Sequence, residues 1–235
     1  MVRRLLNKFR ARGSDQTAEP LYELSLGRIP DGERLYAIGD IHGRLDLLRE
    51  LHEAIAADRS SNGDGQRVTI IYLGDYIDRG LESRPVIDLL LSPPEDGARR
   101  IFLLGNHEAM LLAFLDSTRG AAAWLRNGGD TTLHSYGAGT FNGPVGESEL
   151  ETARHALRDQ LGEAHLAFFQ NLRLCHELGD YYFVHAGVRP GRPLNQQARE
   201  DMIWIRKDFL ESREDYGKII VHGHSIRAKV EERSN

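Results

Sequence analysis

The sequence predicts an α/β fold in which buried strands deliver polar side chains to one edge of a sheet. Three short apolar runs, at 35–38, 68–73 and 101–104, each end in a glycine followed by a polar residue. Each run is followed by a segment with helical character. This alternation indicates an α/β sheet, in which the loops outside the carboxyl ends of the strands form a crevice that binds ligands.

Each of the five predicted strands is stopped by a polar turn. The strands at 35–38, 68–73, 101–104, 181–184 and 218–221 are followed, in this order, by Gly39-Asp40, Gly74-Asp75, Gly105-Asn106, His185-Ala186-Gly187 and His222-Gly223-His224. The first predicted helix carries Leu47, Leu48, Leu51 and Ile55 at helical spacing, and the second spans about 83–91. The sequence therefore places histidine, carboxylate and amide groups at one edge.

The composition excludes several classes of protein. The net charge of −5 and the pI near 6.1 give no global attraction to nucleic acid or anionic lipid, so we expect no nucleic-acid partner. Cys175 is the single cysteine, which excludes an internal disulfide framework and fits a reducing compartment. Because no apolar run is long enough to cross a bilayer and charges interrupt the start, we expect a cytoplasmic protein with no transmembrane segment.

The polar groups at the strand ends form a set suited to metal ions. Its members combine carboxylate, imidazole and amide oxygen without thiolate, a mixture that manganese, iron or zinc accepts. They are Asp40, His42, Asp75, Asp78, Asn106, His107, His185 and His224. A structural role is the default for any one of them, but independent structural needs would not place all of them at strand ends in this order.

Five short blocks resemble a known family. They are 39–43 (Gly-Asp-Ile-His-Gly), 74–80 (Gly-Asp-Tyr-Ile-Asp-Arg-Gly), 105–108 (Gly-Asn-His-Glu), 184–187 (Val-His-Ala-Gly) and 223–225 (Gly-His-Ser). In this order they resemble the phosphoprotein phosphatase family of metallophosphatases, in particular bacterial serine/threonine protein phosphatases of the calcineurin-like superfamily. The resemblance covers about residues 34–226. It implies a four-layer α/β/β/α sandwich, two sheets flanked by helices.

The resemblance also implies two divalent metal ions, manganese first, with iron or zinc as alternatives. Asp40 and His42 would hold the first ion, Asp75 would bridge, and Asn106, His185 and His224 would complete the second. Two cations about 3.5 to 4 Å apart lower the pKa of a bridging water, so that hydroxide is available for in-line attack on phosphorus. The expected substrates are phosphorylated proteins or peptides.

The alkoxide of serine or threonine is a poor leaving group, so a proton donor is required. We predict that His107 is this general acid and that Asp78 holds its imidazole in the needed tautomer. Arg79 and Arg206 are expected to bind the phosphate oxygens. Glu108 is expected to support the site from behind the ligands.

The alternative function is hydrolysis of diadenosine tetraphosphate and related dinucleotides. Enzymes of that type typically carry aspartate after Asn-His and lack an Asp-Arg-Gly ending, so Glu108 and the 78–80 block favour the protein phosphatase. Nuclease relatives usually carry a second histidine where this chain has Ile226. A cysteine-dependent phosphatase needs an arginine six positions after Cys175, where Tyr181 stands. A binding module that has lost catalysis would lack at least one ligand, and none is missing.

The chain is expected to divide into two parts. Residues 1–26 form a basic arm, interpreted as a solvated terminus, with peripheral contact to acidic lipid or a partner as the alternative. Residues 27–235 form the catalytic domain, with 118–170 as a helical, cap-like insertion.

The end of the chain departs from the family pattern. It stops at Asn235, 11 residues past His224 (235 − 224), and Ile226 replaces an expected proline. We therefore expect the second sheet to lack its last strands. An exposed edge near 219–221 would then allow self-association, and the second metal ion would bind more weakly than the first.

Overall fold

The computed structural model describes residues 27–61, 65–94, 97–141, 143 and 145–226. The predicted basic arm, 1–26, and the charged ending, 227–235, lie outside the described residues, and the predictions made for them stay predictions. The bounds of the expected catalytic domain also stay a prediction.

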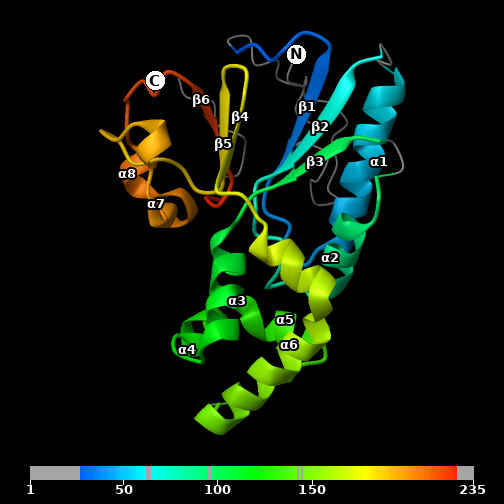
Figure 1. Ribbon diagram of the computed structural model, residues 1–235, viewed down its shortest axis with the longest axis vertical. Coiled ribbons are helices and arrows are strands. Elements are labelled where there is room, and N and C mark those ends of the chain that lie inside the picture. The colour runs from blue at the N-terminus through cyan, green and yellow to red at the C-terminus, as the bar shows by residue number, and fades with distance from the viewer. Residues whose placement is uncertain (1–26, 62–64, 95–96, 142, 144, 227–235) are drawn as a thin grey trace, which may run out of the picture.

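Two three-stranded sheets form the centre of the molecule (Figure 1). The first contains three parallel strands in the order β1-β2-β3: β1 (Glu33–Ile38), β2 (Arg67–Tyr72) and β3 (Arg99–Phe102). The second has the order β4-β5-β6, with β5 antiparallel to β4 and parallel to β6: β4 (Cys175–Leu178), β5 (Tyr181–Val184) and β6 (Ile219–Val221). Five of these strands lie within two residues of their predicted bounds, and β4 is a strand that sequence analysis did not predict.

The two sheets pack face to face through every second side chain of their strands. Leu35, Ile71 and Ile101 of the first sheet share one buried apolar cluster with Tyr181 and Phe183 of the second. Because successive side chains of a strand point to opposite faces, their neighbours must face outward. The cluster therefore marks the interface between the two sheets.

The outer faces of both sheets are covered by helices. Tyr36 and Tyr72 pack in a cluster that includes residues of α1 (Leu45–Ser61) and α2 (Ser83–Leu91). On the other side, Tyr182 and Val184 pack with residues of α7 (Arg199–Trp204) and α8 (Lys207–Leu210), which follow the 3₁₀ turn η2 (Leu194–Gln196). The order helix, sheet, sheet, helix is the predicted four-layer α/β/β/α sandwich, and the fold prediction is confirmed.

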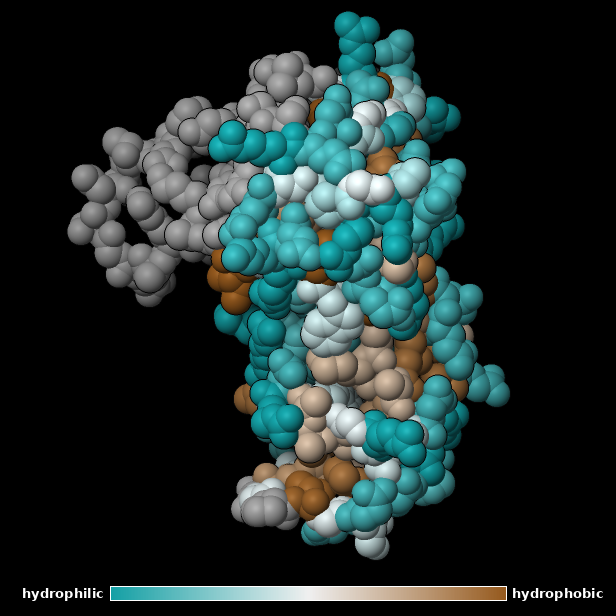
Figure 2. Space-filling view, turned by 90° about the vertical axis from the view of Figure 1, so that its left-hand side faces the viewer, coloured by the Kyte–Doolittle hydropathy of each residue, from teal (hydrophilic) through white to brown (hydrophobic). Residues whose placement is uncertain are grey.

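A group of helices extends beyond the carboxyl ends of the strands and forms the lower part of Figure 1. It comprises α3 (Asn106–Asp116), α4 (Ala121–Trp124), the π-helical turn η1 (Leu125–Gly129), α5 (Asp130–Ser135) and α6 (Glu147–Gln170). All but α3 fall in the predicted insertion at 118–170. In Figure 2, hydrophilic side chains cover most of the upper part of the face, whereas apolar ones gather on the lower, helical part.

Two further expectations concern the surface. Within the described residues, none of the helices combines the length and apolar character that a bilayer crossing requires. Strand β6 lies at the edge of the second sheet, and its three residues are half-buried. Self-association through this edge stays a prediction.

Candidate metal centre

The predicted site residues come together at the carboxyl ends of the strands. Asp40 and His42 follow β1, Asp75, Asp78 and Arg79 follow β2, Asn106 and His107 begin α3, His185 follows β5, and His224 follows β6. Because β1, β2, β5 and β6 carry these residues at the same edge of the sandwich, segments far apart in sequence meet there.

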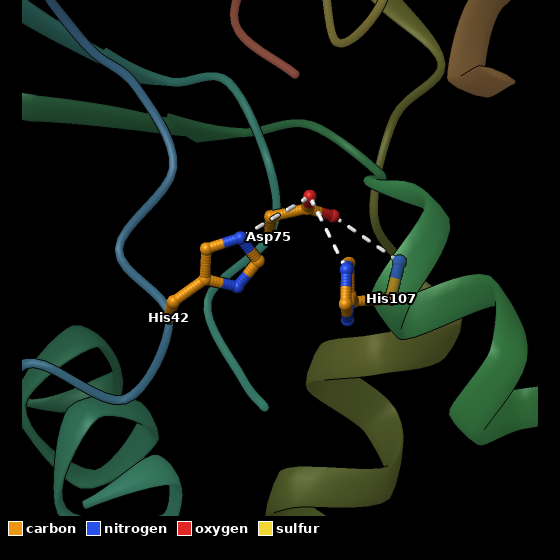
Figure 3. A group of neighbouring side chains, drawn as sticks. All are labelled: His42, Asp75 and His107. Carbon is orange, nitrogen blue, oxygen red and sulfur yellow. Dashed lines mark hydrogen bonds and ion pairs between the residues drawn. The ribbon is translucent and has the colours of Figure 1, made fainter. Parts of the chain in front are cut away.

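Asp75 lies at the centre of this arrangement. Its Oδ2 atom is 3.4 Å from Nε2 of His185, 3.8 Å from Nε2 of His42 and 3.9 Å from Nε2 of His107. Figure 3 shows the rings of His42 and His107 on either side of the carboxylate. The buried carboxylate therefore faces several imidazole nitrogens at once.

Two groups of potential metal-ligating atoms occur among the described residues, and Asp75 belongs to both. His42, Asp75 and His107 form one group, and Asp75, His185 and His224 form the other, with the ligating atoms of each group within 4.8 Å of one another. A carboxylate shared by two groups can bridge two cations, the role predicted for Asp75.

The surroundings of His185 fit a cation. Its Nδ1 atom lies 2.8 Å from the carbonyl oxygen of Leu73 and is placed to donate to it, which leaves the lone pair of Nε2 facing inward. This Nε2 atom is 3.0 Å from Oδ1 of Asn106 and 3.2 Å from Nδ1 of His224. These three atoms each carry a lone pair, and there are too few N–H donors among them to form hydrogen bonds with all of the lone pairs. A divalent cation would satisfy them.

His42 is oriented in the same way. Its Nδ1 atom lies 3.0 Å from the carbonyl oxygen of Ile77 and is placed to donate to it, so Nε2 points toward Asp75. Among the described residues, the buried Nε2 atoms of His42 and His224 have no hydrogen-bond partner. An unpaired buried nitrogen is costly unless a ligand satisfies it, so both atoms fit a metal site.

Asp40 and His107 relate differently to the two groups of potential ligands. Oδ1 of Asp40 accepts a hydrogen bond of 3.0 Å from the backbone N–H of His224, and Asp40 belongs to neither of the two groups found among the described residues. His107, predicted as the general acid, also belongs to the first group, and its catalytic role stays a prediction. The ligand role of Asp40 stays a prediction.

The charges in the site act on one another. Burial disfavours the charged ring of His185, but the negative charge of Asp75 raises its pKa to about 9. Burial, the charge of His185 and the charge of Arg206 lower the pKa of His224 to about 3. Burial opposes ionisation of Asp75, but the neighbouring histidines hold its pKa well below the usual range. Asp75 is therefore an anion that attracts positive charge, either a proton on His185 or a divalent cation that would replace that proton, and His224 is neutral, as a metal ligand must be.

Backbone strain is concentrated in the same residues. His42, Asp75, Asp78, Arg79 and His224 have φ between 48° and 72°, and they are all of the non-glycine residues with positive φ in the described part of the chain. Such conformations cost about 1–3 kcal/mol each and persist where the surroundings enforce them, often at functional sites. All five were predicted as site residues from the sequence.

His107, a member of the first group, forms a buried pair with Asp78. Nδ1 of His107 donates to Oδ2 of Asp78 at 2.6 Å, and Nη2 of Arg79 lies 3.3 Å from Nε2 of His107. Burial opposes protonation of His107, but Asp78 and Asp75 raise its pKa above the ordinary value. The guanidinium of Arg79 and Nε2 of His107 therefore lie next to each other.

Arg206 lies at the exposed rim of the site. It is exposed and directly precedes α8, and after burial and His185 its charge is the next cause of the lowered pKa of His224. The neighbouring Trp204 is 44% exposed, and its ring centre is 6.3 Å from that of His224.

Most of the chain matches one known protein family. The model of the calcineurin-like phosphoesterases matches residues 33–232, which include every predicted site residue. The chain belongs to the calcineurin-like phosphoesterase family.

The chain is similar in sequence to several proteins that are named for different activities. The chain is 30% identical to a zinc-dependent endopolyphosphatase of Saccharomyces cerevisiae over 66% of this chain and 47% of the relative. It is 31% identical to a symmetrical bis(5'-nucleosyl)-tetraphosphatase of Dechloromonas aromatica over 75% of this chain and 53% of the relative. It is also 36% identical to serine/threonine-protein phosphatase 2 of Escherichia coli over 41% of this chain and 38% of the relative. This calcineurin-like phosphoesterase thus spans about half the length, or less, of these relatives.

Glu108 supports the centre from behind, as expected. Its carboxylate accepts hydrogen bonds from the backbone N–H groups of Asp75, Tyr76 and Gly105, at 2.8 to 3.1 Å. Burial and the charge of Asp75 raise the pKa of Glu108 to about 7. Glu108 therefore joins the loop after β2 to the start of α3, the two segments that carry Asp75 and His107.

Two residues that sequence analysis missed contact the His107–Asp78 pair. Nε1 of Trp124 donates to Oδ2 of Asp78 at 2.8 Å, and Oγ1 of Thr132 donates to Oδ1 at 2.6 Å. The sequence carried one signal for Trp124, which stands four residues before the glycine pair at 128–129. A buried tryptophan needs a hydrogen-bond acceptor for its indole N–H. That signal does not tell which acceptor is used.

Proposed function

We propose that this chain is a metal-dependent phosphomonoester hydrolase that acts on phosphoserine and phosphothreonine in proteins. The observation that carries the proposal is the buried His107–Asp78 pair beside a carboxylate shared by two groups of ligands. Family membership supports hydrolysis of a phosphoester, and the pair supports the choice of substrate.

The proposed metal ligands are those predicted from the sequence. Asp40, His42 and Asp75 would hold one divalent ion, and Asp75, Asn106, His185 and His224 the other. Manganese is the proposed metal, with iron or zinc as alternatives, because imidazole, carboxylate and amide ligands suit all three. When bound, the ions would supply an activated water and positive charge for the phosphate.

His107 would provide the proton for the leaving group. An alkoxide of serine or threonine leaves poorly without protonation, whereas a phosphate anhydride has a better leaving group. The acceptor Asp78 orients His107, holds a proton on Nδ1, and favours the charged ring. A general acid held in place in this way assists hydrolysis of an alkyl phosphate most. Its presence therefore supports a protein phosphatase over a dinucleoside tetraphosphatase.

Arg79 and Arg206 would bind the phosphate oxygens. Arg79 already lies beside Nε2 of His107, so a phosphate that it holds would place its leaving oxygen near the proton donor. Arg206 would approach from the side of His224.

The second candidate is a symmetrical dinucleoside tetraphosphatase. The Dechloromonas relative with this activity matches a larger share of this chain than the Escherichia coli phosphatase does. The exposed indole of Trp204 beside His224 could stack on a base, which would suit a nucleotide substrate.

Turnover of matched substrates tests the proposal. A phosphoserine peptide, a phosphothreonine peptide and diadenosine tetraphosphate are compared at equal concentration with added manganese, then after chelation. We expect the phosphopeptides to be turned over with the higher kcat/KM, and we expect chelation to abolish turnover until manganese is restored. A higher kcat/KM for the dinucleotide would favour the second candidate. Full activity in a preparation shown to be metal-free would overturn the mechanism.

A further inference from the structure

The carboxylate of Asp78 is completely buried and its oxygens accept three side-chain hydrogen bonds. Oδ2 accepts from Nδ1 of His107 and Nε1 of Trp124, and Oδ1 accepts from Oγ1 of Thr132. A buried charge is stable only when such donors surround it. Trp124 and His107 share one oxygen, so the position of that oxygen relative to the imidazole depends on the indole.

Both additional donors come from the helical insertion, not from the sandwich. Trp124 ends α4 and Thr132 lies in α5, and both side chains are buried. Oγ1 of Thr132 is also 3.0 Å from Oγ of Ser83, and both hydroxyls accept from the backbone N–H of Asp78 at 3.0 to 3.1 Å. The insertion therefore contacts the main chain and the side chain of Asp78.

The turn between these helices, η1, contacts the next residue. The carbonyl oxygen of Gly128 accepts a hydrogen bond of 3.2 Å from the backbone N–H of Arg79. Gly128 has φ of 100°, and a Cβ atom there would lie 2.6 Å from the nitrogen of Arg79. A Cβ atom at Gly129 would lie 2.5 Å from the indole of Trp124. The two glycines thus let the turn approach Arg79 and let Trp124 occupy its place.

We infer that the segment 121–135 is part of the catalytic machinery and that Trp124 is a positioning residue for the general acid. The inference rests on the proposed function, in which His107 donates the proton. Trp124 holds Oδ2 of Asp78 where it meets Nδ1 of His107, and Thr132 fixes the other oxygen. The insertion therefore orients the proton donor, a role beyond the cap bordering the site that the sequence predicted.

The first test compares two leaving groups. Trp124→Phe keeps a buried aromatic ring and removes the N–H donor, so we expect kcat for a phosphoserine peptide to fall about tenfold with KM unchanged. An aryl phosphate needs less protonation, and its kcat should fall much less. In a His107→Asn background the substitution should have no further effect, because its action passes through His107.

Three further variants complete this test. Tyr136→Phe is the negative control. It removes a hydroxyl directly after this segment that lies 2.9 Å from Nδ1 of His165 and is not among the hydrogen-bond donors to Asp78, so the ratio of the two substrates should stay unchanged. Thr132→Val should reproduce the selective loss and Thr132→Ser should restore most of it. This pair keeps the test decisive if Trp124→Phe does not fold.

A second readout does not depend on activity. The chain has two tryptophans, and Trp204 provides an internal reference for the indole N–H resonance of Trp124. Asp78→Asn should shift the Trp124 resonance and leave that of Trp204 in place. An unshifted Trp124 resonance, equal losses for both substrates, or a loss that persists in the His107→Asn background would overturn the inference. A wild-type protein that hydrolyses neither substrate would overturn the proposed function and, with it, this role of Trp124.

Discussion

At the residue scale, hydrogen bonds to the backbone decide which atom of each side chain faces the centre. Nδ1 of His42 and Nδ1 of His185 are bound to carbonyl oxygens, so Nε2 of each ring is directed inward. In His107 the Nδ1 atom is bound instead to the carboxylate of Asp78. A histidine paired with a carboxylate keeps a proton on Nδ1 and favours the charged ring, as a proton donor requires.

Replacement of His107 tests this assignment. We expect His107→Asn to lower kcat for an alkyl phosphate by about 10² to 10⁴, the range for loss of a general acid. The loss for an aryl phosphate should be smaller, and the metal content should not change. Equal losses for both substrates, or loss of a metal ion measured by elemental analysis, would place His107 among the binding residues instead.

His52 predicts a pH dependence of stability away from the metal centre. Its Nε2 atom lies 2.9 Å from the hydroxyl of Tyr72, and burial, with the charge of Arg100, lowers its pKa to about 4. The unfolded chain takes up this proton near pH 6.5, but the folded chain does so only near pH 4, so stability is lost as pH falls between these values.

A single variant isolates this contribution. His52→Gln cannot be protonated, so its Tm should fall less than that of the wild type between pH 7 and pH 5, by roughly 3 °C. Thermal unfolding at both pH values, followed by circular dichroism, measures the difference. An identical fall in both proteins would show that His52 does not couple folding to protonation.

At the scale of elements, the turn η1 joins the helical insertion to the loop after β2. Gly128→Ala would place a methyl group against the backbone of Arg79 and impose a strained positive φ. We expect it to lower the free energy of unfolding by about 2–4 kcal/mol and to reduce activity. Gly137→Ala is the matched control, because Gly137 also has a positive φ, 67°, but no atom of the described residues lies within 4 Å of its Cβ position. Denaturant unfolding measures the free energy of unfolding of both variants, and Gly128→Ala should lose more. Equal losses would show that the positive φ alone, and not the contact with Arg79, accounts for the effect.

The same elements show how far sequence reasoning reaches. The strand ends could be predicted because apolar runs stopped by glycine and a polar residue are local signals. The role of α4 and α5 could not, because Trp124 and Thr132 lie 46 and 54 residues from Asp78 in the chain. Their hydrogen bonds depend on how the insertion packs, and nothing in the local sequence specifies that. Strand β4 was missed for a related reason, since its half-buried residues Cys175, His176 and Leu178 show no clear alternation.

At the scale of the whole molecule, the four layers bring five loops to one edge. The two sheets pack through Leu35, Ile71 and Phe183 among others, so the loops after β1, β2, β3, β5 and β6 are held against one another by a buried apolar interface. Asp75 is the point where the loops from both sheets meet, since His42 belongs to the first and His185 to the second. Asp75 is therefore expected to serve both metal sites.

Metal binding by Asp75→Asn tests this expectation most directly. The substitution keeps the size of the side chain and removes the charge that both groups of ligands share. Calorimetric titration of metal-free protein with manganese, with elemental analysis of the product, should find two ions per chain in the wild type and neither ion tightly bound in Asp75→Asn. A wild type that binds a single ion, or an Asp75→Asn protein that still binds two, would contradict the account.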